Sequence, residues 1–175
     1  MNDAILDSAR PPGTIRLRPE RPEDEPFLFA VYASTREEEL NLTGWDAATR
    51  AAFLELQFKA MRQGYRSMFP QGEFTIILLA GQPVGRQVVN CTGTEIRLVD
   101  VALLPAYRGR GIGTILLRQL LGEAARQNKP LRLCVLKMSR PARLYERVGF
   151  CRVGEEGLYD RMEWKPGAFG PQLGL

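Results

Sequence analysis

The chain has 175 residues, of which 45% are hydrophobic and 25% charged, and a formal net charge of +4. These values are typical of a globular protein of one domain, and no apolar stretch reaches the roughly 18 residues that a membrane-spanning helix needs. The sequence contains no histidine, which excludes Ser-His-Asp hydrolysis, Cys-His proteolysis and the usual zinc enzymes. We therefore expect no metal and no membrane partner.

The first residues, "MNDAILDSARPPG", have neither a charged n-region nor an apolar h-region, so we expect the protein to stay in the cytoplasm. The three cysteines are an odd number without CxxC spacing, and two of them lie in apolar, strand-like stretches. We expect all three, Cys91, Cys134 and Cys151, to be reduced core residues, with neither a disulfide framework nor a zinc site.

In the first half of the chain, the pattern predicts a strand, two helices and two strands. The strand is "TIRLRP" (14–19), and an amphipathic helix follows over 22–34. Asp46 is a plausible N-cap for a longer helix over 47–65, whose apolar stripe contains Phe53, Leu54, Phe58 and Met61. The strands 73–80 and 83–91 then form a hairpin around a Gly81-Gln82 turn.

The second half continues with a strand, a glycine-rich loop and alternating helices and strands. The expected elements are a strand over 94–104, a helix over 112–127, a strand over 131–136, a helix over 140–148 that Gly149 ends, and two strands in 150–154 and 157–164. This order predicts an α/β (α+β) fold with one mixed sheet of about seven strands and four helices. We place a disordered lead at 1–13, the domain at 14–165 and a tail at 166–175.

The loop before the predicted helix 112–127 reads "YRGRGIGTILL" (107–117), with glycines at 109, 111 and 113 between arginines. A helix N-terminus leaves backbone N–H groups unpaired, and glycines let the backbone approach an anion closely. A phosphate or pyrophosphate is the natural occupant. The charge distribution agrees, because residues 101–175 carry 13 basic and 6 acidic side chains, whereas residues 1–100 carry 11 and 14.

Two common phosphate loops do not fit this stretch. A P-loop needs a Gly-Lys pair, which the chain lacks, and the dinucleotide fingerprint belongs in a first βαβ unit rather than after an antiparallel meander. The pattern that fits is Arg-x-x-Gly-x-Gly, formed by Arg108, Gly111 and Gly113, with "VALLPAY" before it and "LYERVGF" some 30 residues later. With these motifs, residues 95–155 resemble the GNAT superfamily of acyl-coenzyme A dependent N-acetyltransferases.

The resemblance implies a donor site for acetyl-CoA as cosubstrate. The backbone N–H groups of the loop would bind the coenzyme A pyrophosphate, and the main chain of the preceding strand would pair with the pantetheine arm. On this chain the loop residues are Arg108, Gly109, Arg110, Gly111, Ile112, Gly113 and Thr114, and the strand residues are Val101, Ala102 and Leu103.

The "LYERVGF" block implies a general acid. Tyr145 matches the tyrosine that often gives a proton to the departing thiolate; its alternative role is a packed aromatic on an amphipathic helix. Relatives often have Asn-x-Ala before this helix, where this chain has Ser139 and Pro141. Ser139 then replaces the asparagine contact to the pantetheine with a shorter one, and Arg143 is a candidate phosphate ligand.

The reaction also needs a base. An amine with a pKa of about 10.4 is almost fully protonated at neutral pH, so a carboxylate must take its proton, directly or through water. The first candidates are Glu95 and Asp100, and the second are Glu37, Glu38 and Glu39. Glu95 and Asp100 are five residues apart, so one of them faces the cleft. Their alternative roles are a solvated edge residue for Glu95 and an ion pair with Arg86 or Arg97 for Asp100.

These features predict transfer of an acetyl group from acetyl-CoA to an amine by direct attack, in an acyltransferase whose partner is a small or protein amine. A non-catalytic acyl-CoA sensor or scaffold remains the alternative. Nucleic acid is an unsuitable partner, because no basic run is interleaved with aromatics. Members of the superfamily are often dimers, so the resemblance is compatible with a homodimer. The sequence does not identify the acceptor amine.

Overall fold

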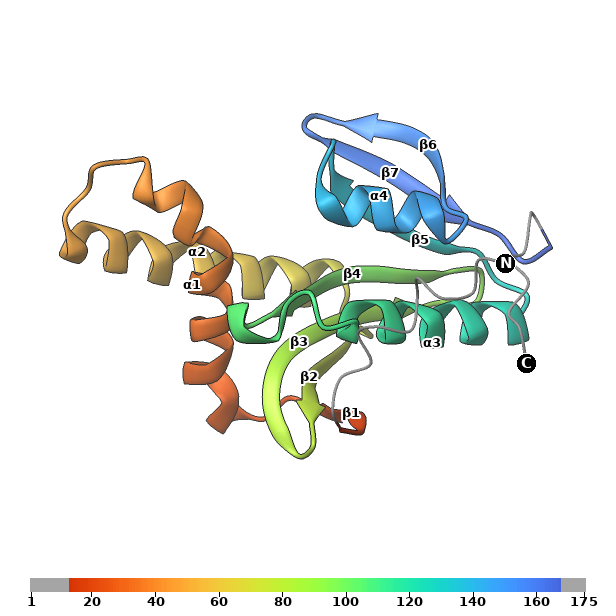
Figure 1. Ribbon diagram of the computed structural model, residues 1–175, viewed down its shortest axis with the longest axis horizontal. Coiled ribbons are helices and arrows are strands. Elements are labelled where there is room, and N and C mark those ends of the chain that lie inside the picture. Colours follow the sequence, from red (N-terminus) through yellow and green to blue (C-terminus); the bar gives the residue numbers. More distant parts are fainter. Residues whose placement is uncertain (1–12, 168–175) are drawn as a thin grey trace, which may run out of the picture. The chain divides into compact units, whose positions relative to one another are not determined.

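The computed structural model describes residues 13–167, and within them the chain forms seven β-strands. They are β1 (Ile15–Pro19), β2 (Glu73–Leu79), β3 (Gln82–Cys91), β4 (Ile96–Leu103), β5 (Leu131–Leu136), β6 (Cys151–Glu156) and β7 (Tyr159–Trp164). Hydrogen bonds join the strands in the order β1-β2-β3-β4-β5-β7-β6 (Figure 1). β4 and β5 are parallel and β1–β2, β5–β7 and β6–β7 are antiparallel, which confirms the predicted mixed sheet.

Four α-helices accompany these strands in the described part of the chain, as predicted. They are α1 (Glu25–Asn41), α2 (Ala47–Met68), α3 (Ile112–Arg126) and α4 (Arg140–Arg147), with 3-10 turns η1 (Pro22–Asp24) and η2 (Pro105–Tyr107). α1 begins three residues later than predicted, after η1, and ends about two turns later, because the run after Ser34 contains good helix formers and Arg36 pairs with Glu39 at 2.8 Å. None of the helices in residues 13–167 has the length and apolar character to cross a membrane.

Two local predictions concern turns and caps. The Asp46 carboxylate accepts a hydrogen bond from the Thr49 N–H at 2.7 Å, so Asp46 is the N-cap of α2 as expected. The β2–β3 hairpin turns at Ala80 and Gly81, one residue earlier than predicted, and both have positive φ, at 49° and 84°. Two positive φ values match a turn that follows the right-handed twist of the strands. The predicted lead at 1–13 and tail at 166–175 fall almost wholly outside the described residues.

The chain packs as two compact units. Within the described residues, the first unit contains 13–88 together with 100–112, and the second contains 89–99 together with 113–167. In the first unit, α1, α2 and β2 supply a buried cluster of Leu28, Tyr32, Phe58 and Ile76. The Phe58 ring centroid lies 5.7 Å from that of Tyr32, so aromatic packing joins the two helices.

In the second unit, side chains alternate along β5. Leu131, Leu133 and Val135 are buried, while Cys134 points to the opposite face and is exposed. Cys151 on β6 is exposed as well. All three cysteines are free, but the prediction that they are core residues is wrong for these two, because an apolar stretch does not reveal which face of a strand each residue occupies.

A close approach between β3 and β4 requires Gly85. A Cβ at this position would lie 2.3 Å from the Ala102 carbonyl oxygen and 2.7 Å from Leu103 Cδ2. We expect Gly85→Ala to destabilise the protein by about 1–3 kcal/mol, since backbone must move to relieve the overlap. Gly64→Ala in α2 is the matched control, because a Cβ there meets no atom within 4 Å and helix propensity favours alanine. Thermal unfolding of both variants tests this; equal melting temperatures would contradict the close approach.

A half-buried ion pair links β1 to the start of α1. Arg18 donates to both carboxylate oxygens of Asp24 at 2.6 Å, and the Arg21 N–H donates at 2.8 Å. The hydrogen bonds from Arg18 hold the pKa of Asp24 below its ordinary value. A lowered folded-state pKa stabilises the fold above the unfolded pKa of about 3.9, and this stability is lost as pH falls through the lower, folded pKa.

Asp24→Asn should therefore lower the free energy of unfolding at neutral pH by about 1.5–3 kcal/mol and flatten its dependence on pH in the acid range. Urea midpoints from neutral to acid pH measure this. Glu23→Gln is the control, because the Glu23 carboxylate is next to Asp24 in the chain but is exposed. An equally flattened profile for Glu23→Gln would refute a special contribution from Asp24.

Candidate active site

The glycine loop leaves η2 and leads directly into α3. Gly109 and Gly111 have φ values of 72° and 77°, in the left-handed region that favours glycine. Among the described residues, no hydrogen bond uses the N–H of Gly109, Arg110 or Gly111 as donor. The first N–H groups of α3 likewise have no intrahelical acceptor. The loop therefore presents consecutive backbone donors, as an anion site requires.

The Arg108 side chain stabilises this loop through hydrogen bonds. Its Nε donates to the Leu103 carbonyl at 2.9 Å, and its Nη2 donates to the carbonyl and hydroxyl oxygens of Ser34 at 3.1 and 3.0 Å. These bonds tie the end of β4 and the loop to α1. Arg110, by contrast, is exposed, and its guanidinium lies 5.5 Å from the Tyr107 ring centroid. Of the two arginines, Arg110 is the one whose side chain is not held by hydrogen bonds.

Gly113 lies in the first turn of α3 and has no need of glycine's conformational freedom. Its φ lies outside the left-handed region, and a Cβ built on it would meet nothing within 4 Å. Glycine at this position instead leaves open space beside the first turn of the helix. That space is compatible with a ligand held against the backbone, as predicted for the residues from Ile112 to Thr114.

The last part of β4 carries the predicted pantetheine-binding residues. Val101 and Leu103 are half-buried and Ala102 is buried. The Leu104 N–H donates to the Val84 carbonyl at 2.9 Å, and Gly85 allows β3 to approach closely beside Ala102. Neighbouring β3 therefore fixes the position of this stretch of main chain.

Asp100 lies one residue before this stretch, and its predicted ion pair with Arg86 is confirmed. Arg86 Nε donates to Asp100 Oδ2 at 2.7 Å. Asp100 Oδ1 accepts no hydrogen bond from the described residues, and the side chain is 19% exposed. One carboxylate oxygen of Asp100 is therefore paired with the Arg86 guanidinium, and the other has no hydrogen-bond donor among the described residues.

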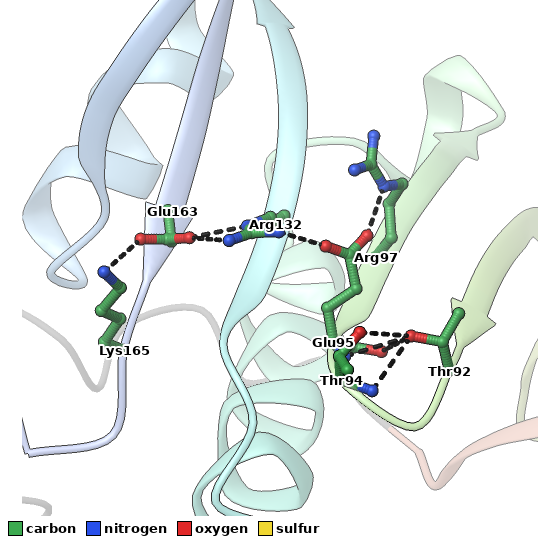
Figure 2. A network of polar contacts seen from close by, with 7 residues as sticks. All are labelled: Thr92, Thr94, Glu95, Arg97, Arg132, Glu163 and Lys165. Atoms are coloured by element: carbon green, nitrogen blue, oxygen red, sulfur yellow. Dashed lines mark hydrogen bonds and ion pairs between the residues drawn. The ribbon is translucent and has the colours of Figure 1, made fainter.

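Glu95 belongs to the second unit and has different surroundings from those expected. It is not a solvated edge residue, because its side chain is only 14% exposed and both oxygens are paired. One oxygen accepts from Arg97 at 2.9 Å and the other pairs with Arg132, which in turn binds Glu163 (Figure 2). Glu95 thus belongs to a chain of ion pairs that connects β4, β5 and β7.

The same network shifts the pKa values of its other members. Burial favours the neutral form of Glu163, but hydrogen bonds from Lys165 and Arg132 outweigh it, so the pKa of Glu163 lies below its ordinary value. Hydrogen bonds to Glu163 and Glu95 raise the pKa of Arg132. Figure 2 shows the continuous path from Lys165 to Arg97. We interpret these residues as a structural network of charges.

Three further predicted residues lie on or beside α4, in the second unit. Tyr145 is 8% exposed, and its ring packs against Phe150 at a centroid distance of 5.5 Å. Ser139 is the N-cap of α4, where its hydroxyl oxygen accepts from the Ala142 N–H at 3.3 Å. Arg143 is exposed. In the first unit, Glu39 pairs with Arg36, and Glu37 and Glu38 are exposed.

The first unit also contains a small cavity that sequence reasoning missed. It measures about 20 Å³, and its charged lining residues are Glu20, Arg62, Arg66, Arg86 and Asp100. They come from the end of β1, α2, β3 and β4, so only folding brings them together. The one signal in the sequence was Arg86, a charge within the apolar stretch "PVGRQVV".

Comparison with known proteins adds a family and a fold. Residues 70–152 match the acetyltransferase (GNAT) domain; none of the curated proteins matches the sequence. The structure is similar to the PaiA N-acetyltransferase of Thermoplasma acidophilum, solved in complex with coenzyme A, at a TM-score of 0.64 and 19% identity over 87% of this chain and 99% of that one.

Two further structures have the same fold. PH1933 from Pyrococcus horikoshii has a TM-score of 0.63 at 19% identity, covering 88% of this chain and 99% of its own. An acetyltransferase from Thermus thermophilus has a TM-score of 0.62 at 19% identity, covering 87% and 97%. At these identities the likeness establishes the fold and does not identify an acceptor.

Proposed function

Because the chain belongs to the GNAT superfamily through its acetyltransferase domain at residues 70–152, we propose that it transfers an acetyl group from acetyl-CoA to an amine. The observation that carries the proposal is the glycine loop, whose left-handed Gly109 and Gly111 present unpaired N–H groups ahead of α3. Fold alone supports many chemistries. The loop geometry, inside the matched domain, adds a binding site of the right character.

The donor proposal rests on how these residues fit coenzyme A. The pyrophosphate would accept from the backbone N–H groups between Gly109 and Thr114, and the open space beside Gly113 leaves room for it. Arg110 and Arg143 are exposed cations that would add attraction for the phosphates. Val101, Ala102 and Leu103 would pair with the pantetheine arm through their main chain. Acetyl-CoA itself supplies an activated thioester.

For the proton of the acceptor, we assign Asp100 rather than Glu95. Asp100 Oδ1 is not hydrogen-bonded in the described structure, whereas both oxygens of Glu95 are paired with arginines. The acceptor's ammonium would lose its proton to Asp100, directly or through water. The neutral amine then attacks the thioester carbonyl carbon and a C–N bond forms. The nitrogen of the tetrahedral adduct releases its second proton to solvent, and the C–S bond breaks as the coenzyme A thiolate leaves.

For the departing thiolate, we assign Tyr145 as the proton donor. A phenol of ordinary acidity is protonated at neutral pH, so it can give a proton to a thiolate and regain one from solvent. Tyr145→Phe retains the ring packing against Phe150 and removes only the hydroxyl. We expect it to lower kcat about 10- to 100-fold, and the melting temperature of the variant separates this effect from a loss of stability. An unchanged kcat would show that Tyr145 only packs.

The test of the function is amine-dependent release of free coenzyme A thiol from acetyl-CoA. The purified protein is given a panel of polyamines, aminoglycosides, amino acids and peptides with free N-termini. We expect at least one amine to increase thiol release well above hydrolysis. Tight coenzyme A binding without thiol release for any amine would contradict the proposal and favour an acyl-CoA sensor.

A further inference from the structure

Arg86 is buried more completely than its known interactions explain. Arg86 is only 6% exposed, yet its guanidinium has one strong hydrogen-bond acceptor, Asp100 Oδ2. Nη2 donates to the thioether sulfur of Met61 at 3.3 Å, a weak acceptor. Nη1 is buried and has no hydrogen-bond partner in the described structure. A buried, unpaired donor on a charged group costs free energy, so an acceptor is expected there.

Arg86 lines the cavity of the first unit, which offers space of the right size for such an acceptor. The volume of about 20 Å³ is that of one water-sized group. The cavity is therefore large enough for one oxygen atom and too small for a whole substrate. Asp100 lines the same cavity, so a molecule whose oxygen enters it would have its remaining atoms close to the proposed base.

The charges around the cavity select the sign of the group. Three arginines, Arg62, Arg66 and Arg86, line it together with two carboxylates, Glu20 and Asp100. Glu20 is shared between Arg62, at 3.1 Å, and Arg66, and Asp100 is paired with Arg86. One positive charge is left over. A polyamine would add to the imbalance, whereas a carboxylate would neutralise it.

We propose that Arg86 Nη1 binds a carboxylate oxygen of the acceptor, and that the acceptor is an amine carrying a carboxylate, of the amino-acid class. This inference rests on the proposed acetyl transfer and names its substrate class. Arg86 then does two things: it pairs with Asp100 through Nε and binds the acceptor through Nη1. A site built to bond a polar group discriminates strongly against analogues that lack the group.

The test compares amines that differ only in the carboxylate. The pairs are phenylalanine with phenethylamine, lysine with cadaverine and arginine with agmatine, and each amino acid amide is a third arm that keeps the carbonyl without the charge. We expect kcat/KM for thiol release from acetyl-CoA to be about 10²-fold or more higher for the accepted amino acid than for its decarboxylated partner. Equal or better use of the decarboxylated amines would overturn the inference and leave acetyl transfer intact.

A variant separates binding from chemistry. Arg86→Lys keeps the positive charge but removes both Nη1 and the Nε that pairs with Asp100, so kcat should fall with both amines, while KM should rise about 10- to 100-fold for the amino acid only. Arg18→Lys is the matched control: it alters another aspartate-paired arginine in the same unit, away from the cavity lining, and should keep the preference for the carboxylate. An equal change in KM for both amines in Arg86→Lys would assign Arg86 a purely structural role and overturn the inference.

A readout without turnover keeps the two proposals distinguishable. The melting temperature of the wild-type protein is measured with each amino acid and with its decarboxylated partner, in the absence of acetyl-CoA. We expect stabilisation by the amino acid only. If no amine gives thiol release, acetyl transfer fails, and this measurement still decides carboxylate binding. Stabilisation by neither partner, or by both equally, would identify the occupant of the cavity as water.

Discussion

Replacing Asp100 with asparagine is expected to lower kcat for amine acetylation by about 10²–10⁴-fold, the usual contribution of a general base. Asparagine retains an oxygen that can accept from Arg86 Nε, so the pair at 2.7 Å keeps a hydrogen bond and the fold should survive. The remaining rate should rise with pH, because at high pH more of the acceptor is already neutral. The affinity for acetyl-CoA should not change. Steady-state rates across a pH series, with calorimetric binding of coenzyme A, measure all three effects.

Glu95→Gln is the comparison for this result. Its carboxylate is engaged by Arg97 and Arg132, so we expect the variant to lose stability while its kcat stays that of the wild type. A loss of kcat in Glu95→Gln together with normal turnover in Asp100→Asn would reverse the assignment of the base. Melting temperatures of both variants distinguish unfolding from a catalytic effect.

Replacing Gly113 with valine is expected to lower the affinity for acetyl-CoA by about 10- to 100-fold without lowering the melting temperature. A side chain at this position meets no protein atom within 4 Å, and valine has a better helix propensity than glycine. Its methyl groups would, however, occupy the space beside the first turn of α3, where we propose that the N–H groups bind the pyrophosphate. Loss of one such contact to an anion accounts for the expected decrease.

The same helix offers the control. Gly122 also lies in α3 and also has no atom within 4 Å of a built Cβ, but it is remote from the first turn. Gly122→Val should bind acetyl-CoA as the wild type does. Calorimetric titration of both variants tests the pair, and equal affinities would rule out the loop at Gly113 as the donor site.

The elements that sequence predicted well are those set by local chemistry. Asp46 is the N-cap of α2, and Gly109 and Gly111 have the left-handed backbone conformation. The bounds of β5 were predicted correctly. Each of these depends on residues close together in the chain, where periodicity, caps and turn preferences act. The order of the elements then predicted the mixed sheet, and the resemblance to the GNAT superfamily came from Arg108, Gly111 and Gly113 together with "LYERVGF".

The predictions that failed, and the features that were missed, depend on residues distant in the chain. The exposure of Cys134 follows from which face of β5 a helix covers, and the pairing of Glu95 with Arg132 joins residues 37 positions apart. The cavity beside Arg86 combines four elements. Residues 1–100 carry a net negative charge, yet the cavity that they form carries more arginines than carboxylates. Average charge does not determine local charge.

The central claim is acetyl transfer from acetyl-CoA to an amine, and the most direct measurement follows the acetyl group itself. The purified protein is incubated with acetyl-CoA labelled isotopically in the acetyl group and with the panel of amines, and the amines are analysed by mass spectrometry. We predict labelled, N-acetylated product that forms with wild-type protein and falls sharply with Asp100→Asn. Bound acetyl-CoA that retains its label in the presence of every amine would contradict the claim.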